Sequence, residues 1–199
     1  MVGCGRLPAF VLQAADSIVS DLSPWLTADC LAAPLDASVR DWLFEPGSLT
    51  LRLTTLAGGD FSVRPLLEGW HGLRDDECAV LGLAPGSTGW VREVYLCGHG
   101  EPWVFARSVA SREALQALEL DLQHLGKRPL GHLLFSDKAF GRSPFEICHY
   151  PPAWLPAEAA QAGLWARRSC FQRGSVGVLV AEIFLPPHWR AVRAADGNP

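Results

Sequence analysis

The stretch WVREVYLCGHGEPWVFARSVA, residues 90–110, decides the fold. Two runs rich in β-branched and aromatic residues, 90–97 and 103–110, flank the segment GHGEP, whose glycines permit a tight turn. This pattern predicts an antiparallel β-hairpin. Because side chains alternate between the two faces of a strand, Arg92 in the first run and Arg107 in the second each share a face with large apolar neighbours.

Further strands are indicated on both sides of the hairpin. The segment SLTLRLTTL, residues 48–56, alternates leucine with polar residues, which is typical of a strand. Leucines recur at spacings of three and four in residues 111–126, which predicts a helix ended by Gly126. Strands that surround one long helix, without regular βα alternation, indicate an α+β fold with an antiparallel sheet and helices packed on one face. The other strand candidates are residues 61–70, 145–150, 164–174 and 175–187.

The length of 199 residues fits a single domain. Hydrophobic residues make up 49% of the chain and charged residues 19%, so the chain has enough apolar surface to form a core. We divide it into an N-terminal extension of residues 1–34, a domain of residues 35–190 and a frayed C-terminal tail of residues 191–199. Within the extension, residues 9–20 suit a helix, and Asp36 is placed to cap a short helix after it.

Charge and motif content exclude several classes of function. The 17 Lys and Arg against 21 Asp and Glu give a net charge of −4, which argues against a nucleic-acid partner. Six scattered cysteines without a CxxC pair indicate a reducing compartment, so we expect a cytoplasmic protein. The six histidines show no ligand spacing, which predicts no metal site. The sequence contains no apolar run of membrane-spanning length, no serine nucleophile elbow, no P-loop and no dinucleotide fingerprint.

Glu182 is the strongest single candidate for a functional residue. It lies in VLVAEIFLP, residues 178–186, where every other side chain is apolar and an unpaired carboxylate would be costly to bury. One interpretation places it outward, on a sheet face open to solvent. The other places it in a closed polar pocket, where it can donate a hydrogen bond or act as a general acid.

Arg92 and Arg107 are the cations that match this carboxylate. A guanidinium suits a small carboxylate ligand because its planar fork can bind both oxygens. The alternative is that each arginine forms a buried ion pair with Glu93, Glu101 or Glu182.

Arg167 and Arg168 form a second cationic pair. If they lie on a strand, they face opposite sides of it, and we expect one of the two to be simply solvated.

The chain contains four ordered motifs, WVREVYLCGHGEPWVFARSV (90–109), LGKRPLGHLLF (125–135), GLWARRS (163–169) and AEIFLP (181–186). Together they resemble the chorismate pyruvate-lyases of ubiquinone biosynthesis. Weaker similarity at DWLFEPGSLT, residues 41–50, and at FSVRPL extends the resemblance to about residues 35–187. Two features depart from the usual pattern, the long segment of residues 149–162 and the first 34 residues.

The resemblance implies a cofactor-free enzyme that converts chorismate to 4-hydroxybenzoate and pyruvate on a six-stranded antiparallel sheet. The family's carboxylate-binding arginine falls on Arg92 and its catalytic carboxylate on Glu182. The leucine whose backbone amide contacts the ligand falls on Leu130, an apolar contact falls on Leu49, and a second anion contact falls on Arg107. Family members enclose the aromatic product and release it slowly, which implies product inhibition.

A non-catalytic sensor is the alternative from another class. Ligand-sensing domains of some transcription regulators share the fold and bind small carboxylates without turnover. Such domains usually follow a DNA-binding helix-turn-helix, for which the first 34 residues, with Arg6 as their one basic residue, are too short. We therefore expect an enzyme with a small-molecule substrate, no nucleic-acid partner, no membrane insertion and a monomeric state.

Overall fold

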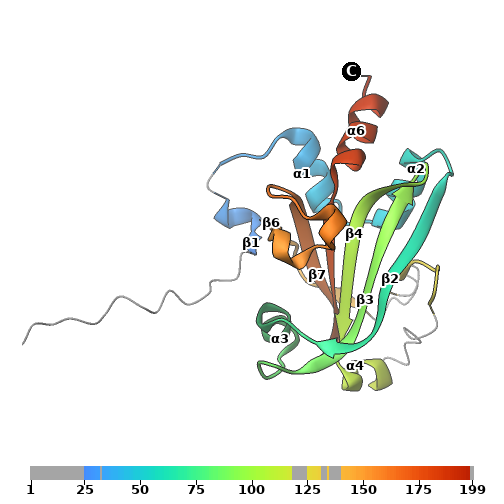
Figure 1. Ribbon diagram of the computed structural model, residues 1–199. Helices are drawn as coiled ribbons and strands as arrows, with labels where there is room; N and C mark the ends of the chain where they lie inside the picture. The colour runs from blue at the N-terminus through green and yellow to red at the C-terminus, as the bar shows by residue number, and fades with distance from the viewer. Residues whose placement is uncertain (1–24, 32, 118–124, 131–133, 135–139, 198–199) are drawn as a thin grey trace, which may run out of the picture.

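The computed structural model describes residues 25–31, 33–117, 125–130, 134 and 140–197, and the helix expected over residues 9–20 lies outside them. These residues form one twisted antiparallel sheet with helices packed against it (Figure 1). The strand order is β1-β6-β7-β8-β4-β3-β2, and β5 pairs with β7. The strands are β1 (Leu26–Thr27), β2 (Phe61–Gly72), β3 (Thr88–Gly98), β4 (Glu101–Ala110), β5 (Gly141–Arg142), β6 (Glu146–His149), β7 (Trp165–Arg173) and β8 (Val176–Phe184). The predicted single α+β domain is confirmed, and the sheet has eight strands in the described residues where six were expected.

The predicted hairpin forms the centre of the sheet as β3 and β4. Its turn is the dipeptide His99-Gly100, and both residues have positive φ, 51° and 76°. Two such residues make a type I′ turn, whose twist matches that of the flanking strands. The pairing shifts by one residue between Leu96 and Cys97, which marks a β-bulge.

The strand predicted over residues 48–56 is wrong. This segment is the helix α2 (Leu49–Leu56), capped by the Ser48 hydroxyl, which accepts a hydrogen bond from the Leu51 backbone N–H. Leu49 and Leu53 are buried at helical spacing, while Leu51 is 68% exposed. The two buried leucines therefore follow the helical period. The apparent alternation arises because it includes Leu51, which is exposed and lies outside the core.

Helices cover both faces of the sheet, although the sequence predicted helices on one face. Helices α1 (Ala37–Phe44), α2 and α6 (Pro186–Ala195) pack against the face that carries Val94, and α3 (Asp75–Leu81) packs against the face that carries Val91. The cap predicted at Asp36 is confirmed, because its carboxylate accepts hydrogen bonds from two N–H groups of the first turn of α1. A further α-helix of the described residues is α4 (Arg112–Ala117).

Both ends of the described chain belong to the fold more closely than predicted. Within the expected extension, Trp25 is buried and β1 pairs with β6. The frayed tail expected from residue 191 is wrong as far as Ala195, because residues 186–195 form α6 and bury Val192. Of the helix predicted over residues 111–126, the structure describes only α4 and the end near Gly126. Among the described residues, no helix is long and apolar enough to cross a membrane.

His188 on α6 is an unusual member of the core. Its side chain is 0% exposed, and neither ring nitrogen has a hydrogen-bond partner in the described part of the chain. The ring centroid lies 4.3 Å from that of Trp42 and 5.0 Å from that of Phe184. Burial, together with the guanidinium charges of Arg52 and Arg167, lowers the pKa of His188 to about 3.

This buried ring should make the protein less stable in mild acid. Above pH ~6.5 the imidazole is neutral in both states, whereas between ~6.5 and ~3 only the unfolded chain takes up the proton. We therefore expect His188 to cost about 2 kcal/mol of unfolding free energy between pH ~7 and pH ~5. Urea unfolding at both pH values measures this loss. Between the same two pH values, the His188→Leu variant should lose about 2 kcal/mol less unfolding free energy than the wild type. Equal losses in the two proteins would show that His188 is not the group responsible.

Candidate active site

A cavity of about 50 Å³ lies between the central strands and the start of α2. Its floor is formed by alternate residues of β3, β4 and β8, which share the face covered by α1, α2 and α6. Residues that line it include Leu49, Arg92, Ala106, Ser108, Leu130, Arg142 and Glu182. Four of the five site residues implied by the resemblance therefore meet in one cavity, from segments far apart in the sequence.

Strand register fixes the positions of the two charged candidates. Arg92 on β3 lies opposite Ser108 on β4, and Glu182 on β8 lies opposite Ala106 on β4. Arg92 and Glu182 therefore lie two strands apart, with a register offset of two residues along the strands. At ordinary strand spacings their Cα atoms are roughly 12 Å apart. The two residues between them are small. The floor between the guanidinium and the carboxylate is thus free of large side chains.

Arg92 is a buried cation with one nitrogen left for a ligand. Its side chain is 3% exposed, and its Nε donates to the Glu68 carboxylate at 2.7 Å. Its Nη2 donates to the backbone carbonyls of Gly126 and Arg128, at 2.7 and 3.1 Å. Nη1 makes no hydrogen bond to any described residue. An anion in the cavity would therefore meet Nη1 rather than the whole planar fork.

Glu182 lines the cavity and is held by Arg167. The Nε of Arg167 donates to Glu182 Oε2 at 2.6 Å, across the register of β7 and β8. Arg167 is 0% exposed, and its Nη1 donates to the backbone carbonyls of Trp42 and Glu45, both at 3.0 Å. Within the described chain, Glu182 Oε1 accepts no hydrogen bond. One carboxylate oxygen is thus fixed and the other is available to a ligand.

Arg142 is a cavity residue that the sequence reasoning missed. Its Nε donates to the Ser169 hydroxyl at 2.8 Å and its Nη1 to the Pro46 carbonyl at 3.0 Å. The guanidinium lies 4.1 Å from the ring centroid of Phe145 and 4.8 Å from that of Phe171. The short segment around it shows neither helical nor strand periodicity, so no pattern in the sequence signals its position.

Leu49 and Leu130 supply apolar wall to the same cavity. Leu49 is the first residue of α2, and both side chains are buried. The wall also includes Val94 and Leu134. In the ranges that the structure describes, no three His, Cys, Asp or Glu residues are arranged to hold a metal ion.

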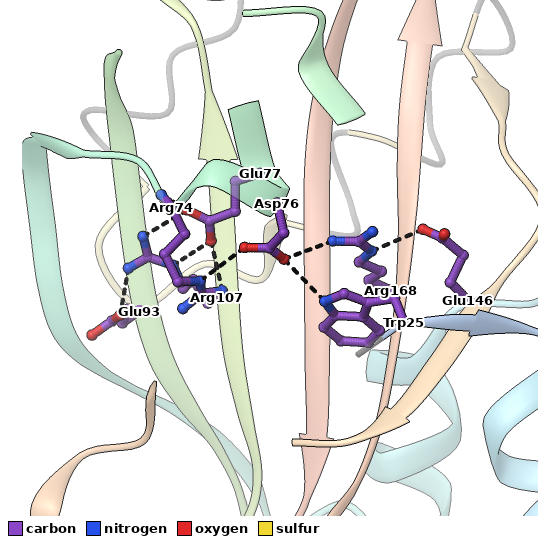
Figure 2. Close-up of polar contacts among 8 residues, drawn as sticks. All are labelled: Trp25, Arg74, Asp76, Glu77, Glu93, Arg107, Glu146 and Arg168. Carbon is purple, nitrogen blue, oxygen red and sulfur yellow. Dashed lines mark hydrogen bonds and ion pairs between the residues drawn. The ribbon is translucent and has the colours of Figure 1, made fainter. Parts of the chain in front are cut away.

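Arg107 is not brought to this cavity. It lies on the opposite face of β4, where its Nε and Nη2 donate to the two oxygens of Glu77, at 2.7 and 3.0 Å (Figure 2). Its Nη1 donates to Glu93 at 2.7 Å. The expected anion contact is therefore wrong for this structure, and the alternative of a buried ion pair with Glu93 holds. Burial alone would raise the pKa of Glu77, but the hydrogen bonds from Arg107 and the charge of Arg74 bring it below its usual value.

Arg168 extends the same buried network, where one of the Arg167–Arg168 pair was expected to be solvated. Arg168 donates to Asp76 and to Glu146, at 2.8 Å each, and Asp76 also accepts from the indole N–H of Trp25 (Figure 2). Both arginines are buried, on opposite faces of β7. The alternation of side chains along a strand correctly predicted that the two arginines lie on opposite faces. It gave no information on whether helices cover both faces of the sheet.

Comparison with known proteins adds to this geometry. "Probable chorismate pyruvate-lyase" of Pseudomonas putida is 61% identical over 169 residues, 85% of this chain and 91% of the relative. The protein of the same name from Pseudomonas aeruginosa is 62% identical over 172 residues, 86% of this chain and 96% of the relative. Among solved structures, the effector domain of PhnF from Mycobacterium smegmatis matches 71% of this chain and 90% of that domain, with a TM-score of 0.50. Its sequence identity is 11%, so this likeness concerns the fold alone.

The profile of the family described as chorismate lyase matches residues 20–194, which include every cavity residue named above. The match begins before residue 35, in agreement with the burial of Trp25 and the pairing of β1. A profile match over most of the sequence, together with relatives at about 60% identity, establishes the family. The chain belongs to the chorismate lyase family.

Proposed function

We propose that this protein is a chorismate pyruvate-lyase, which converts chorismate to 4-hydroxybenzoate and pyruvate. The observation that carries the proposal is the placement of Arg92 and Glu182 at two ends of one cavity with a floor of small side chains. Chorismate has a ring carboxylate at C1 and a hydroxyl at C4, on opposite sides of a six-membered ring. These groups match a guanidinium at one end of the cavity and a carboxylate at the other.

The reaction needs placement more than a reactive group. The C3–O ether bond breaks and its electron pair leaves with the enolpyruvyl oxygen, while C4 loses its hydrogen as a proton. The ring becomes aromatic, and the enolpyruvate gains a proton on its methylene carbon to become pyruvate. Because aromatisation drives the elimination, the protein can contribute by fixing the ring and stabilising the charge that develops.

The contacts support distinct roles for the two ends. We assign Arg92 Nη1 and the backbone N–H of Leu130 to the ring carboxylate. Glu182 Oε1 would accept the hydrogen bond of the C4 hydroxyl, with Oε2 held by Arg167 at 2.6 Å. A carboxylate fixed in this way would orient the C4–H bond and, through its hydrogen bond to the C4 hydroxyl, would be placed to assist proton movement.

A turnover assay separates this proposal from the sensor alternative. Pure protein incubated with chorismate should release 4-hydroxybenzoate and pyruvate in equal amounts, as measured by chromatography and a coupled pyruvate assay. Binding of chorismate or 4-hydroxybenzoate without product formation would instead support a small-carboxylate sensor. The membership of the chain in a family of lyases favours the enzyme.

Arg107 should matter for stability and not for ligand binding. Arg107→Met removes the hydrogen bonds that Glu77 and Glu93 accept from Arg107, which should lower the unfolding free energy by about 3–5 kcal/mol. The remaining ion pair between Glu77 and Arg74 at 2.7 Å places the expected loss near the lower end of that range. Urea unfolding measures this loss. At temperatures where the variant is folded, 4-hydroxybenzoate should bind within about threefold of the wild-type affinity, because Arg107 lies across the sheet from the cavity. If a folded Arg107→Met variant no longer binds 4-hydroxybenzoate, Arg107 does contribute to ligand binding and this prediction is wrong.

Several finer properties belong to the same proposal. We propose that the protein is a cytoplasmic monomer of ubiquinone biosynthesis that has no nucleic-acid partner, needs no cofactor and is inhibited by its product. The buried setting of Arg92 and Glu182 supports slow product release, because a ligand between them would be largely removed from solvent.

A further inference from the structure

The cavity contains a second cation for which the proposed mechanism has no use. Arg142 lies on β5, beside β7, whereas Arg92 lies on β3. Because the strand order is β7-β8-β4-β3, Glu182 on β8 lies between the two arginines. The cavity therefore has a cation beyond each end of the Ala106–Ser108 floor, and Arg142 is at the Glu182 end.

Arg142 is held in place as a binding group would be. Two of its nitrogens donate to Ser169 and to the Pro46 carbonyl, and its Cζ lies over the rings of Phe145 and Phe171. A guanidinium fixed by hydrogen bonds and aromatic contacts loses little further side-chain entropy when an anion binds. The group is preorganised.

The guanidinium of Arg142 lies near a second guanidinium, that of Arg167, and near the Glu182 carboxylate. Burial, followed by the repulsion of Arg167, lowers the pKa of Arg142 to about 10, against the opposing attraction of Glu182. Glu182 itself is bound to Arg167. An anionic group between these side chains would reduce the repulsion between the two guanidinium groups.

We propose that Arg142 binds the enolpyruvyl carboxylate of the substrate. This inference rests on the proposed function, which places the C4 hydroxyl at Glu182. Chorismate carries its second carboxylate on the ether substituent at C3, next to C4, so this carboxylate falls at the Glu182 end of the cavity. The product has lost this group, so Arg142 stabilises substrate over product and is a specificity residue.

Matched aromatic probes test the role of Arg142 without turnover. 3-Carboxymethoxy-4-hydroxybenzoate carries the second carboxylate, and 3-ethoxy-4-hydroxybenzoate has the same chain length without it. Arg142→Gln should lower the affinity for the dianionic probe by about 10–100-fold and the affinity for the ethoxy probe by less than about threefold, as measured by calorimetry. Arg142→Lys, which keeps the charge but not the fork, should recover part of the affinity for the dianionic probe.

Binding of the ethoxy probe also reports whether each variant keeps the shape of the cavity. Equal weakening of both probes would mean that Arg142 only supports the wall through Ser169 and Pro46, and would overturn the inference. Unchanged affinity for both probes would overturn it too.

Turnover separates this inference from the proposed function. If wild-type protein leaves chorismate unconverted but distinguishes the two probes through Arg142, the proposed function fails and the carboxylate site stands. If wild-type protein converts chorismate but Arg142→Gln binds both probes with wild-type affinity, the proposed function stands and this inference fails.

Discussion

Replacing Arg92 with methionine should weaken the binding of both substrate and product. The variant removes the cation whose Nη1 faces the cavity, and a charge-assisted hydrogen bond to a buried carboxylate contributes about 1.5–3 kcal/mol. We therefore expect 4-hydroxybenzoate to bind about 10- to 150-fold more weakly and kcat/KM for chorismate to fall by at least as much. Calorimetry and pyruvate release measure the two effects.

Glu68→Gln is the matched control for this variant. Arg92 also fixes Glu68 and the carbonyls of Gly126 and Arg128, so its removal disturbs the wall as well as the charge. Glu68→Gln keeps Arg92 and removes only the charge of its ion-pair partner, whose side chain is 24% exposed. Affinity for 4-hydroxybenzoate should then change by less than about tenfold. If Glu68→Gln loses as much as Arg92→Met, the effect belongs to the wall and not to a carboxylate contact.

Glu182→Gln should separate chemistry from binding. The amide keeps the size of the side chain and can accept a hydrogen bond from Arg167, but it has no charge with which to assist proton movement at C4. We expect kcat to fall by about 100- to 10,000-fold. Affinity for 4-hydroxybenzoate should fall by less than about tenfold, because the neutral amide can still bond the hydroxyl. Near-wild-type turnover would remove Glu182 from the mechanism.

Arg167→Lys shows whether the fixed orientation of Glu182 matters. Lysine keeps the charge beside Glu182 but cannot bond at once to the carboxylate and to the carbonyls of Trp42 and Glu45. If orientation matters, kcat falls while the KM for chorismate changes little. If the loss of kcat across several Arg167 variants instead follows their loss of stability, measured as the unfolding midpoint, the role of Arg167 is structural.

The sequence predicted the hairpin correctly because two long alternating runs have only one regular conformation that buries them. The same reasoning failed for residues 48–56, where Leu49, Leu51 and Leu53 suit a strand but Leu49 and Leu53 also suit a helix. Tertiary contact decides such a case, since the helix buries two of these leucines and leaves Leu51 exposed. Short segments with both periods cannot be assigned from pattern alone.

Arg107 shows what limits the prediction of a site. The turn at His99-Gly100 would by itself pair residue 92 with residue 107, on one face of the sheet. The bulge between Leu96 and Cys97 shifts the register by one residue, so Arg107 lies opposite Glu93 and faces away from the cavity. A one-residue bulge has no signal in the alternation of side chains. Arg92 and Glu182 were identified because each is the sole charge on its face of an apolar strand.

The most direct measurement of the central claim is a single-turnover experiment with protein in excess over chorismate. Wild-type protein should convert all the chorismate to equal amounts of 4-hydroxybenzoate and pyruvate. Protein that carries both Arg92→Met and Glu182→Gln, and that unfolds cooperatively in urea, should leave the chorismate intact over the same time. Unconverted chorismate with the wild type, or conversion at the wild-type rate by the double variant, would contradict the account.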